Sequence, residues 1–457
     1  MEFDSRAYIE EYIKRAKVAQ SAFEKLSQEE IDKAVRAIAK VIYDNAEFFA
    51  EIAVEETEMG NVPDKILKCK NKSKMIWNNL KNKKSKGIIE IDEEAGITKV
   101  AKPVGVVAAI TPCTNPIVTP MSNSMFALKG GNAIIITPHH KAIRCSTKAV
   151  DIMNASLKSL GMPENLIQIV SVQSRENTRN LISLADVVVA TGGMGMVNAA
   201  YSSGRPALGV GAGNVQCIID RDVDITEAVP KIVTGRAFDN GIVCSGEQTI
   251  ICPKEKFTDI IAELERSNAY VVKSKEEKEA IKNVMFSDGA MSRHAIGRTA
   301  VEIAEAAKIN VPENTKIIVA IADGVGEEDI FSKEKMCPVI TAYTYDDFEE
   351  AVEIARINLE VEGKGHSVSI HSNNTKNIEY VGENLCVSRF LVNQVCAASA
   401  GGSFQNGLAP TNTLGCGSWG HNSISENLDY KHLINVSQIA YLMKDKYVPT
   451  DDEIWNL

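Results

Sequence analysis

Apolar residues recur with helical spacing over the first 84 or so positions of the chain. Three helices are predicted there. The first covers YIEEYIKRAKVAQSAF, the second runs from Gln28 to Thr57 behind an N-cap at Ser27, and the third runs from Lys65 to Leu80. Because each has an apolar face, the helices are expected to pack on another layer of structure.

A strand–turn–strand pattern follows at about residues 86–101, with an acidic tip that contains Glu93, Glu94 and Gly96. This pattern predicts a projecting hairpin, which would suit a contact between subunits.

The pattern then changes to short, almost wholly apolar runs. VGVVAAITP and NAIIITPHH come first, and LIQIVSV, ADVVVATGG and VQCIID continue the series between helical stretches such as the one that ends at Gly161. Runs of this kind are typical of parallel strands that are buried on both faces. We predict a doubly wound sheet through about residue 225, with ligands outside the carboxyl ends of its strands.

The same alternation resumes after Cys244 with QTIICP, KIIVAIA, CPVITAYTY and HSVSIHS, separated by helical stretches. A second α/β unit is therefore expected. The fold class predicted from the pattern is α/β, with two doubly wound units and a hairpin.

Composition and charge narrow the class of protein. The 457 residues are 44% hydrophobic and 24% charged, and no apolar run reaches the roughly 18 residues that a membrane span requires. The N-terminus lacks an apolar signal segment, so a cytoplasmic protein is expected. A net charge of −10 argues against a nucleic-acid partner, and the one basic run, Lys81 to Lys86, is short and fits a solvated linker. A small-molecule substrate is favoured.

The ten cysteines are scattered along the chain, as expected in a reducing compartment. No CxxC pair occurs, and only His139, His140 and His421 come close to a cysteine in sequence, so we expect no metal site. Cys244 is different because it lies in a polar, glycine-containing segment, FDNGIVCSGEQ, which predicts a loop at a cleft. Such a thiol can act as a nucleophile; the alternative is a loop cysteine without a role.

Asn115 follows the first buried strand, where its amide can donate to an oxyanion. It can equally form a turn before Pro116. The second buried strand ends in His139, His140 and Lys141, and the absence of an acidic residue there permits a 2′-phosphate, hence NADP. The alternative is a solvated basic turn. Two glycine loops, TGGMGMV and GVGAGN, lack the GxGxxG spacing, and each alone is weak evidence.

In combination, these segments resemble a known family. ITPCTNPIVTP, IITPHH, ATGGMGMVNAAYSSGRPALGVGAGN, AFDNGIVCSGEQ, KEKMCPV, EGKGHSVSIHS and TLGCGSWGHNSISEN occur in the order found in the CoA-acylating branch of the aldehyde dehydrogenase superfamily. The resemblance covers nearly the whole chain. It is strongest to CoA-acylating succinate-semialdehyde dehydrogenases, with the aldehyde dehydrogenase half of bifunctional aldehyde/alcohol dehydrogenases next.

The resemblance implies roles for individual residues. Cys244 matches the nucleophile, Asn115 the oxyanion-binding amide and His366 a histidine of the CoA-dependent branch near the thiol. Glu334 matches the glutamate that holds the nicotinamide ribose. The positions that match the cofactor-binding segments are Thr111, Pro112, His139, His140, Lys141, Gly192, Gly193, Gly195, Gly211, Gly213 and Glu334.

The resemblance also implies how the domains divide. Residues 1–225 form a cofactor-binding domain, and residues 226–420 form a catalytic domain that carries Cys244. Residues 421–457 form a C-terminal segment that returns to the cofactor domain or to a subunit interface. A homodimer or homotetramer is expected.

In the hydrolytic relatives the loop that corresponds to GVGAGN carries a glutamate that activates water, and here this loop has no carboxylate. Water needs such a base to attack a thioester, whereas a thiol ionises readily near its own pKa. Coenzyme A is therefore the expected acyl acceptor, NAD or NADP the expected oxidant, and His366 would assist deprotonation of the incoming thiol.

The substrate is less constrained than the reaction. Arg389 would suit the distal carboxylate of a succinyl group, but relatives that use acetaldehyde have an arginine in the same segment, and a structural ion pair explains it equally well. CoA-acylating oxidation of acetaldehyde or butyraldehyde is the alternative. Two other classes, a cysteine-dependent acyltransferase or hydrolase without redox chemistry and a non-catalytic nucleotide-binding protein, stay open on the sequence.

Overall fold

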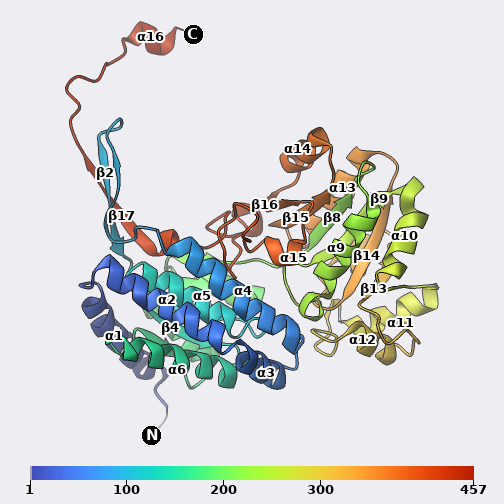
Figure 1. The fold of residues 1–457 in the computed structure, drawn as a ribbon, viewed down its shortest axis with the longest axis horizontal. Coiled ribbons are helices and arrows are strands. Elements are labelled where there is room, and N and C mark those ends of the chain that lie inside the picture. Colours follow the sequence, from blue (N-terminus) through green and yellow to red (C-terminus); the bar gives the residue numbers. More distant parts are fainter. Residues whose placement is uncertain (1–2, 457) are drawn as a thin grey trace.

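Residues 3–456 of the computed structural model are described here, and they form two α/β lobes and a small projecting sheet (Figure 1). The N-terminal lobe is built on a five-stranded sheet and the C-terminal lobe on a seven-stranded sheet. All strand pairs within these two sheets are parallel, which confirms the predicted fold class.

The five-stranded sheet of the N-terminal lobe has the order β5-β4-β3-β6-β7. Its first strand in sequence, β3, lies in the middle, so the chain winds first to one side and then to the other. The strands are β3 (Val106–Thr111), β4 (Ala133–Pro138), β5 (Ile167–Ile169), β6 (Val187–Ala190) and β7 (Ala207–Gly209). The helices between them are α5 (Val118–Lys129), α6 (Ile143–Ser159), α7 (Arg175–Leu184) and α8 (Met194–Tyr201).

Alternate residues of each central strand enter two different cores. Val107 and Ala109 of β3 pack with one layer of helices, while Val106 and Ala108 pack with the layer that includes α1. This explains why the strands are apolar at every position: a parallel strand that is covered on both faces has no solvent side.

The N-terminal helices number four among the described residues, not the three predicted. They are α1 (Ser5–Phe23), α2 (Gln28–Asp44), α3 (Ala46–Thr57) and α4 (Val62–Leu80). The capping box at Ser27 is present, but the long predicted helix breaks at Asn45. The Asn45 amide donates to the carbonyl of Val41 at 2.8 Å. Asparagine competes in this way for backbone partners, and it ends the helix.

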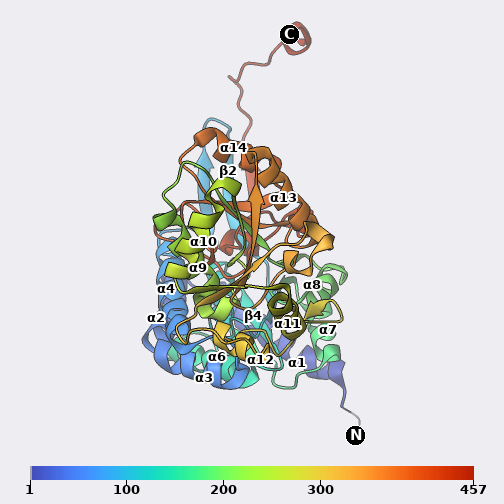
Figure 2. The ribbon, with the colours of Figure 1, turned by 90° about the vertical axis from the view of Figure 1, so that its right-hand side faces the viewer.

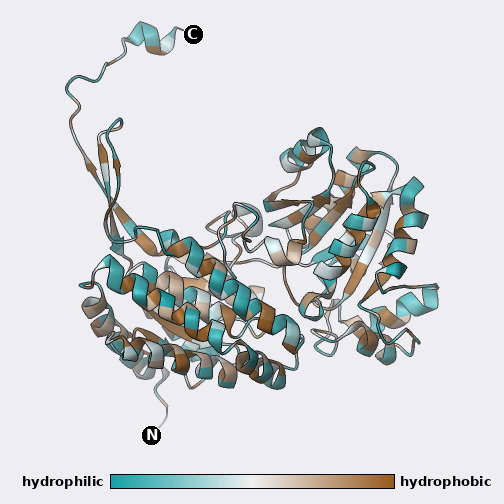
Figure 3. Ribbon diagram, in the orientation of Figure 1, coloured by the Kyte–Doolittle hydropathy of each residue, from teal (hydrophilic) through white to brown (hydrophobic). Residues whose placement is uncertain are grey.

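The seven-stranded sheet of the C-terminal lobe has the order β10-β13-β14-β9-β8-β15-β16. Its strands are β8 (Val215–Ile219), β9 (Glu247–Pro253), β10 (Ala269–Val271), β13 (Ile317–Ile321), β14 (Val339–Tyr345), β15 (Gly365–His371) and β16 (Val387–Val392). The covering helices are α9 (Ile225–Ala237), α10 (Phe257–Arg266), α11 (Lys275–Met285), α12 (Ala300–Ala306), α13 (Phe348–Val361), α14 (Thr375–Asn384) and α15 (Cys396–Ser399). The strands of this lobe are largely apolar (Figure 3).

One strand was assigned to the wrong sheet by the sequence pattern. The run VQCIID, predicted to continue the first sheet to about residue 225, forms β8 and pairs with β9 and β15 of the second sheet. The two sheets therefore divide between Gly209 and Val215. An apolar parallel strand has no feature of its own that specifies which neighbours it pairs with.

The third sheet is antiparallel and consists of β1 (Gly87–Asp92), β2 (Ile97–Pro103) and β17 (Ile434–Ala440). The predicted hairpin is thus joined by a strand from the C-terminal segment. Residues 441–456, with the short helix α16 (Asp451–Trp455), lead away from the body of the molecule in both views (Figures 1 and 2). Within residues 3–456, no helix combines the length and the apolarity that crossing a membrane requires.

Candidate active site

The predicted cofactor residues follow the carboxyl ends of adjacent strands in the N-terminal lobe. Thr111 ends β3, and His139 follows β4, whose last residue pairs with Thr111. The glycine loops follow β6 and β7. Because these strands are neighbours in one parallel sheet, the segments lie together at one edge, and the chain changes direction between β3 and β6.

Space remains at this edge for a bound group. β-Carbons built at Gly192, Gly193 and Gly195 would meet no atom within 4 Å, and Gly193 is the N-cap of α8. The buried hydroxyl of Thr111 has no hydrogen-bond partner within the described part of the chain. Open glycines, a helix N-terminus and an unpartnered hydroxyl fit a dinucleotide.

Cys244 lies between the 3₁₀ turn η1 (Phe238–Gly241) and β9, and it is partly exposed. It packs against the cluster that contains Leu391, Leu414 and Cys416. Burial, followed by the charges of Glu334 and Cys416, raises the pKa of the Cys244 thiol to about 12, although Arg389 and Lys68 act in the opposite direction. The free thiol is therefore mostly protonated at neutral pH.

The loop over residues 210–214 packs directly on the cysteine. A β-carbon at Gly213 would lie 1.9 Å from the carbonyl oxygen of Cys244, so no side chain fits at this position. The backbone N–H of Gly213 donates to Glu334 Oε1 at 3.2 Å. One contact thus joins the loop to Glu334 and another joins it to Cys244.

Glu334 is the carboxylate whose charge acts on the thiol. Burial, followed by the charge of Glu362, raises the pKa of Glu334 to about 8, while the Gly213 N–H opposes the rise. Apart from this one N–H, no hydrogen bond to its carboxylate oxygens is found among the described residues. The group is therefore available to a ligand hydroxyl.

This arrangement predicts the pH dependence of thiol alkylation. In Glu334→Gln the negative charge beside Cys244 is lost, so the pKa of the thiol falls and the midpoint of the rate-versus-pH curve for iodoacetamide inactivation moves down. The effect should appear above about pH 8, where Glu334 ionises in the wild type. Glu327→Gln, at an exposed carboxylate, is the matched control. An unmoved or raised midpoint in Glu334→Gln would contradict the placement of this charge.

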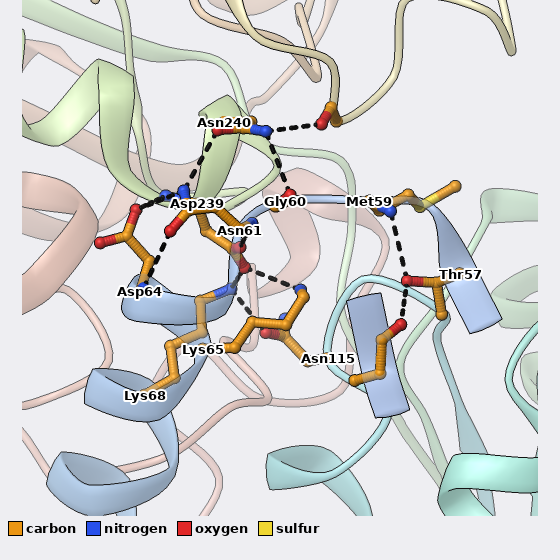
Figure 4. Close-up of polar contacts among 12 residues, drawn as sticks. Thr57, Met59, Gly60, Asn61, Asp64, Lys65, Lys68, Asn115, Asp239 and Asn240 are labelled. Atoms are coloured by element: carbon orange, nitrogen blue, oxygen red, sulfur yellow. Dashed lines mark hydrogen bonds and ion pairs between the residues drawn. The ribbon is translucent and has the colours of Figure 1, made fainter. Parts of the chain in front are cut away.

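Asn115 lies in the bend between β3 and α5, and its side chain contacts a different helix. The Oδ1 atom of Asn115 accepts a hydrogen bond from Lys68 Nζ at 2.9 Å. Lys68 is on α4 and also pairs with Asp239, which belongs to the turn η1 that precedes Cys244 (Figure 4). The Asn115 side chain is thus held by a cation, which the turn-forming alternative does not require.

Lys72 lies seven positions beyond Lys65, which is about two helical turns, and it is on the same side of α4 as Lys68. Its Nζ atom donates to the carbonyls of Gly401 at 2.7 Å and Thr411 at 3.1 Å. Burial, with the charge of Lys68, lowers the pKa of Lys72 to about 8, and the thiolate of Cys244 would raise it. No carboxylate within residues 3–456 forms a salt bridge with this ammonium.

His366, on β15, is fully buried, and both of its ring nitrogens lack a hydrogen-bond partner among the described residues. Burial and the nearby Arg389 hold the pKa of this imidazole well below its ordinary value. The ring is therefore neutral. No hydrogen bond links it to Cys244 in the described structure, so its role toward the incoming thiol remains a prediction.

Arg389 is buried and engaged with neutral partners. Its guanidinium donates to Ser367, Asn427 and the carbonyl of His366, at 3.1, 3.3 and 2.7 Å. Because these partners are neutral, Arg389 is not in a structural ion pair. Because they occupy its guanidinium, it is not a free cation for a substrate carboxylate either. It ties β15 and β16 to the segment around Asn427.

The basic turn after β4 gains acidic neighbours from α3. Glu56 accepts hydrogen bonds from the backbone N–H groups of Arg144 and Cys145, each at 2.7 Å, and Glu55 pairs with the Arg144 guanidinium. Burial, followed by the charges of His140, Lys141 and Arg293, lowers the pKa of His139 to about 4. Lys141 remains as an exposed cation, so the turn admits either NAD or NADP.

Sequence reasoning missed several residues near the thiol: Lys68, Lys72, Asp239 and Cys416. The three lysines 65, 68 and 72 do recur with helical spacing, but lysines on a helix ordinarily predict a solvated face. Here that face turns toward the other lobe. Cys416 was noted only within a family segment, and it lies against Gly211, 3.5 Å from where a β-carbon would be.

The chain is similar to known proteins over nearly its whole length. The model of the aldehyde dehydrogenase family matches residues 2–408. The acetylating succinate-semialdehyde dehydrogenase of Clostridium kluyveri is 55% identical over 98% of each chain. The sulfoacetaldehyde dehydrogenase of an Acholeplasma species is 43% identical over 97% of this chain and 93% of its own.

Solved structures give the same result. An acetylating aldehyde dehydrogenase from Geobacillus thermoglucosidasius is 37% identical, with a TM-score of 0.94 over 97% of this chain and 98% of its own. A propionaldehyde dehydrogenase from Rhodopseudomonas palustris, with bound CoA and an acylated cysteine, is 27% identical, with a TM-score of 0.84 over 95% and 97%. An engineered glycolyl-CoA reductase with bound NADP⁺ is also 27% identical, with a TM-score of 0.84 over 95% and 96%. The chain therefore belongs to the aldehyde dehydrogenase family.

Proposed function

We propose that this protein is a CoA-acylating succinate-semialdehyde dehydrogenase, which interconverts succinate semialdehyde, CoA and NAD(P)⁺ with succinyl-CoA and NAD(P)H. The single observation that carries the acyl transfer to CoA is the loop over residues 210–214. It packs on Cys244, has no carboxylate, and has no room for a side chain at Gly213. An acyl group on Cys244 therefore lacks a water-activating base on this loop.

The residues at the edge of the five-stranded sheet fit the nicotinamide cofactor. Glu334 would hold the nicotinamide ribose, and the open glycines that begin with Gly192 would face the pyrophosphate beside the N-terminus of α8. When bound, the cofactor supplies the hydride acceptor of the oxidation. Glu334 is the carboxylate whose charge acts on the Cys244 thiol. A ribose hydroxyl bound to Glu334 would occupy this carboxylate, so it could not activate water for hydrolysis of the thioester.

In the forward direction the Cys244 thiolate attacks the aldehyde carbon, and a thiohemiacetal forms on the sulfur. The Nδ2 of Asn115 and the backbone N–H of Cys244 donate to its oxyanion. Loss of a hydride from the carbon leaves an acyl thioester on Cys244. The CoA thiolate then attacks this thioester, Cys244 leaves as a thiolate, and acyl-CoA is released. One thioester replaces another, so the exchange is close to reversible.

Positive charge near the thiol supports an anionic substrate. Lys65, Lys68 and Lys72 face this region, and the one carboxylate that pairs with any of them among the described residues is Asp239. Two of the three lysines, Lys65 and Lys68, bind Asp239, whereas Lys72 contacts only carbonyls in the described structure. We propose Lys72 as the cation that attracts the distal carboxylate of succinate semialdehyde.

Replacing Lys72 tests this substrate assignment. In Lys72→Met we expect KM for succinate semialdehyde to rise about tenfold or more, with kcat and the parameters for butyraldehyde little changed, because only the anion loses a charge contact. Wild-type KM for succinate semialdehyde should also rise as pH passes the Lys72 pKa of about 8. A Lys72→Met enzyme with unchanged discrimination between the two aldehydes would contradict the assignment.

A coupled assay tests the function as a whole. Succinate semialdehyde, acetaldehyde and butyraldehyde are compared by kcat/KM with CoA and with either NAD⁺ or NADP⁺, by the absorbance of the reduced nicotinamide. The proposal requires CoA dependence and a preference for succinate semialdehyde. A preference for the uncharged aldehydes would assign the protein to the short-chain enzymes of the same branch, and no absorbance change would favour a cysteine acyltransferase without redox chemistry.

Three further expectations follow from the sequence alone and belong to this proposal. They are a cytoplasmic location, a homodimer or homotetramer, and a role for the neutral His366 in deprotonating the CoA thiol. The three-stranded sheet of β1, β2 and β17 provides a projecting element that would suit a subunit contact.

A further inference from the structure

We infer that Lys68 is a positioning residue for the oxyanion-binding amide of Asn115, and that Asp239 holds Lys68 in place across the two lobes. This inference rests on the oxyanion role proposed for Asn115. Its basis is a chain of contacts that joins the cofactor lobe to the turn just before the nucleophile (Figure 4).

The first link sets the orientation of the amide. A side-chain amide has one acceptor, the oxygen, and an ammonium group has only donors. Because Lys68 Nζ lies 2.9 Å from the Asn115 side chain, the atom toward Lys68 must be Oδ1. The Nδ2 donors then point away from Lys68, and no described residue accepts a hydrogen bond from them. A cation on Oδ1 also polarises the amide and strengthens its N–H groups as donors.

The second link fixes Lys68 itself. Its ammonium pairs with Asp239, whose side chain is fully buried. Burial by itself would raise the pKa of Asp239, but Lys68 and Lys65 hold it below its ordinary value. Lys68 also lies 5.8 Å from the centre of the Phe238 ring. With a charged partner on one side and a ring on the other, the ammonium is held between the two lobes.

The third link explains the unusual backbone of the turn. Asp239 and its neighbour Asn240 both have left-handed φ angles, 50° and 52°. The Asp239 N–H donates to Asp64 at 2.7 Å, and its carboxylate accepts from the Asn61 N–H at 3.1 Å. Contacts with the start of α4 thus stabilise a conformation that costs free energy in isolation. Cys244 follows Asp239 by five residues. The same cluster of contacts therefore positions both the proposed nucleophile and the Asn115 amide.

Two other uses of Lys68 make different predictions. The charge of Lys68 lowers the pKa of Cys244. If Lys68 acted only through this charge, its loss would slow the Asn115→Ala enzyme as much as the wild type. If it bound the substrate carboxylate, its loss would raise KM for succinate semialdehyde but not for butyraldehyde. A residue that acts through Asn115 lowers kcat for both aldehydes by the same factor, because every aldehyde forms the same oxyanion.

The experiment is a double-mutant cycle on kcat, with the full-length enzyme and both aldehydes. We expect Lys68→Met to lower kcat about 10- to 100-fold with either substrate. Lys68→Arg, which keeps a cation and a donor, should recover part of this loss. The double variant K68M/N115A should be no slower than Asn115→Ala alone, because the two changes remove one function. Lys70→Met is the matched control, since Lys70 is a partly exposed lysine of the same helix and its one ion pair among the described residues is with Glu47.

Each result decides the inference. Additive losses in the double variant or a loss confined to succinate semialdehyde would each overturn it. If Lys68→Met does not fold, as judged by its thermal transition, the same cycle is run with Lys68→Gln, which keeps an N–H donor. An Asn115→Ala enzyme with the wild-type kcat would instead overturn the oxyanion role itself, and a fully active Cys244→Ala enzyme would overturn the proposed function.

Discussion

The Cys244→Ala variant is expected to lose CoA-dependent reduction of NAD(P)⁺ by at least about 10³-fold, because no thiohemiacetal or thioester forms without the nucleophile. Binding should survive, since the side chain is small and only partly buried. The measurement is the rate of nicotinamide absorbance change with succinate semialdehyde, together with the mass of the enzyme after incubation with succinyl-CoA. The wild type should gain one acyl group and the variant none.

The chain supplies its own control for this result. Cys386 is likewise partly buried, but it lies just before β16, and Cys386→Ala should keep both the activity and the acylation. Retained turnover in Cys244→Ala would contradict the whole mechanism. Acylation that persists while turnover is lost would place the acyl group on another of the free cysteines.

Asn115→Ala is expected to lower kcat about 10²- to 10³-fold, with a smaller effect on KM. The amide donates where negative charge develops on the substrate oxygen, so its loss is felt in the transition state more than in substrate binding. Steady-state kinetics with both aldehydes check the result. Asn384→Ala, at an exposed residue near the end of α14, is the control and should behave as wild type.

A second substitution at the same position separates donation from packing. Asn115→Asp has almost the same shape but presents no N–H, and it would bring a negative charge toward the oxyanion. It should therefore be at least as slow as Asn115→Ala. An aspartate variant with near wild-type kcat would show that the side chain fills space and does not stabilise charge.

The two lobes each contribute groups to the proposed reaction. Asn115 and the glycine loops come from the N-terminal lobe, whereas Cys244 and Glu334 come from the C-terminal lobe. The Gly213–Glu334 contact and the Lys68–Asp239 pair both cross between them. The catalytic geometry therefore depends on how the lobes meet, and a change at Asp239 would be felt at both the thiol and the amide.

Local patterns of residues were enough to predict the local features. Unbroken apolar runs specified parallel strands with two covered faces, and the polar segment around Cys244 specified an accessible loop, because these patterns depend only on neighbouring residues. Asn115 was a candidate from its position after the first buried strand, whereas Glu334 was supplied by the family resemblance. The N-cap at Ser27 was also predicted from the sequence, although the break at Asn45 was not.

The contacts between segments that are distant in the sequence are seen first in the folded chain. Folding placed β8 in the second sheet, brought Gly213 and Glu334 together across 121 positions, and set Lys68 against Asp239 across 171. The lysines of α4 predict a solvated face from the sequence, but in the structure the second lobe covers this face. Pairings of this kind depend on the packing of whole lobes, and no local pattern of apolar and polar residues specifies them.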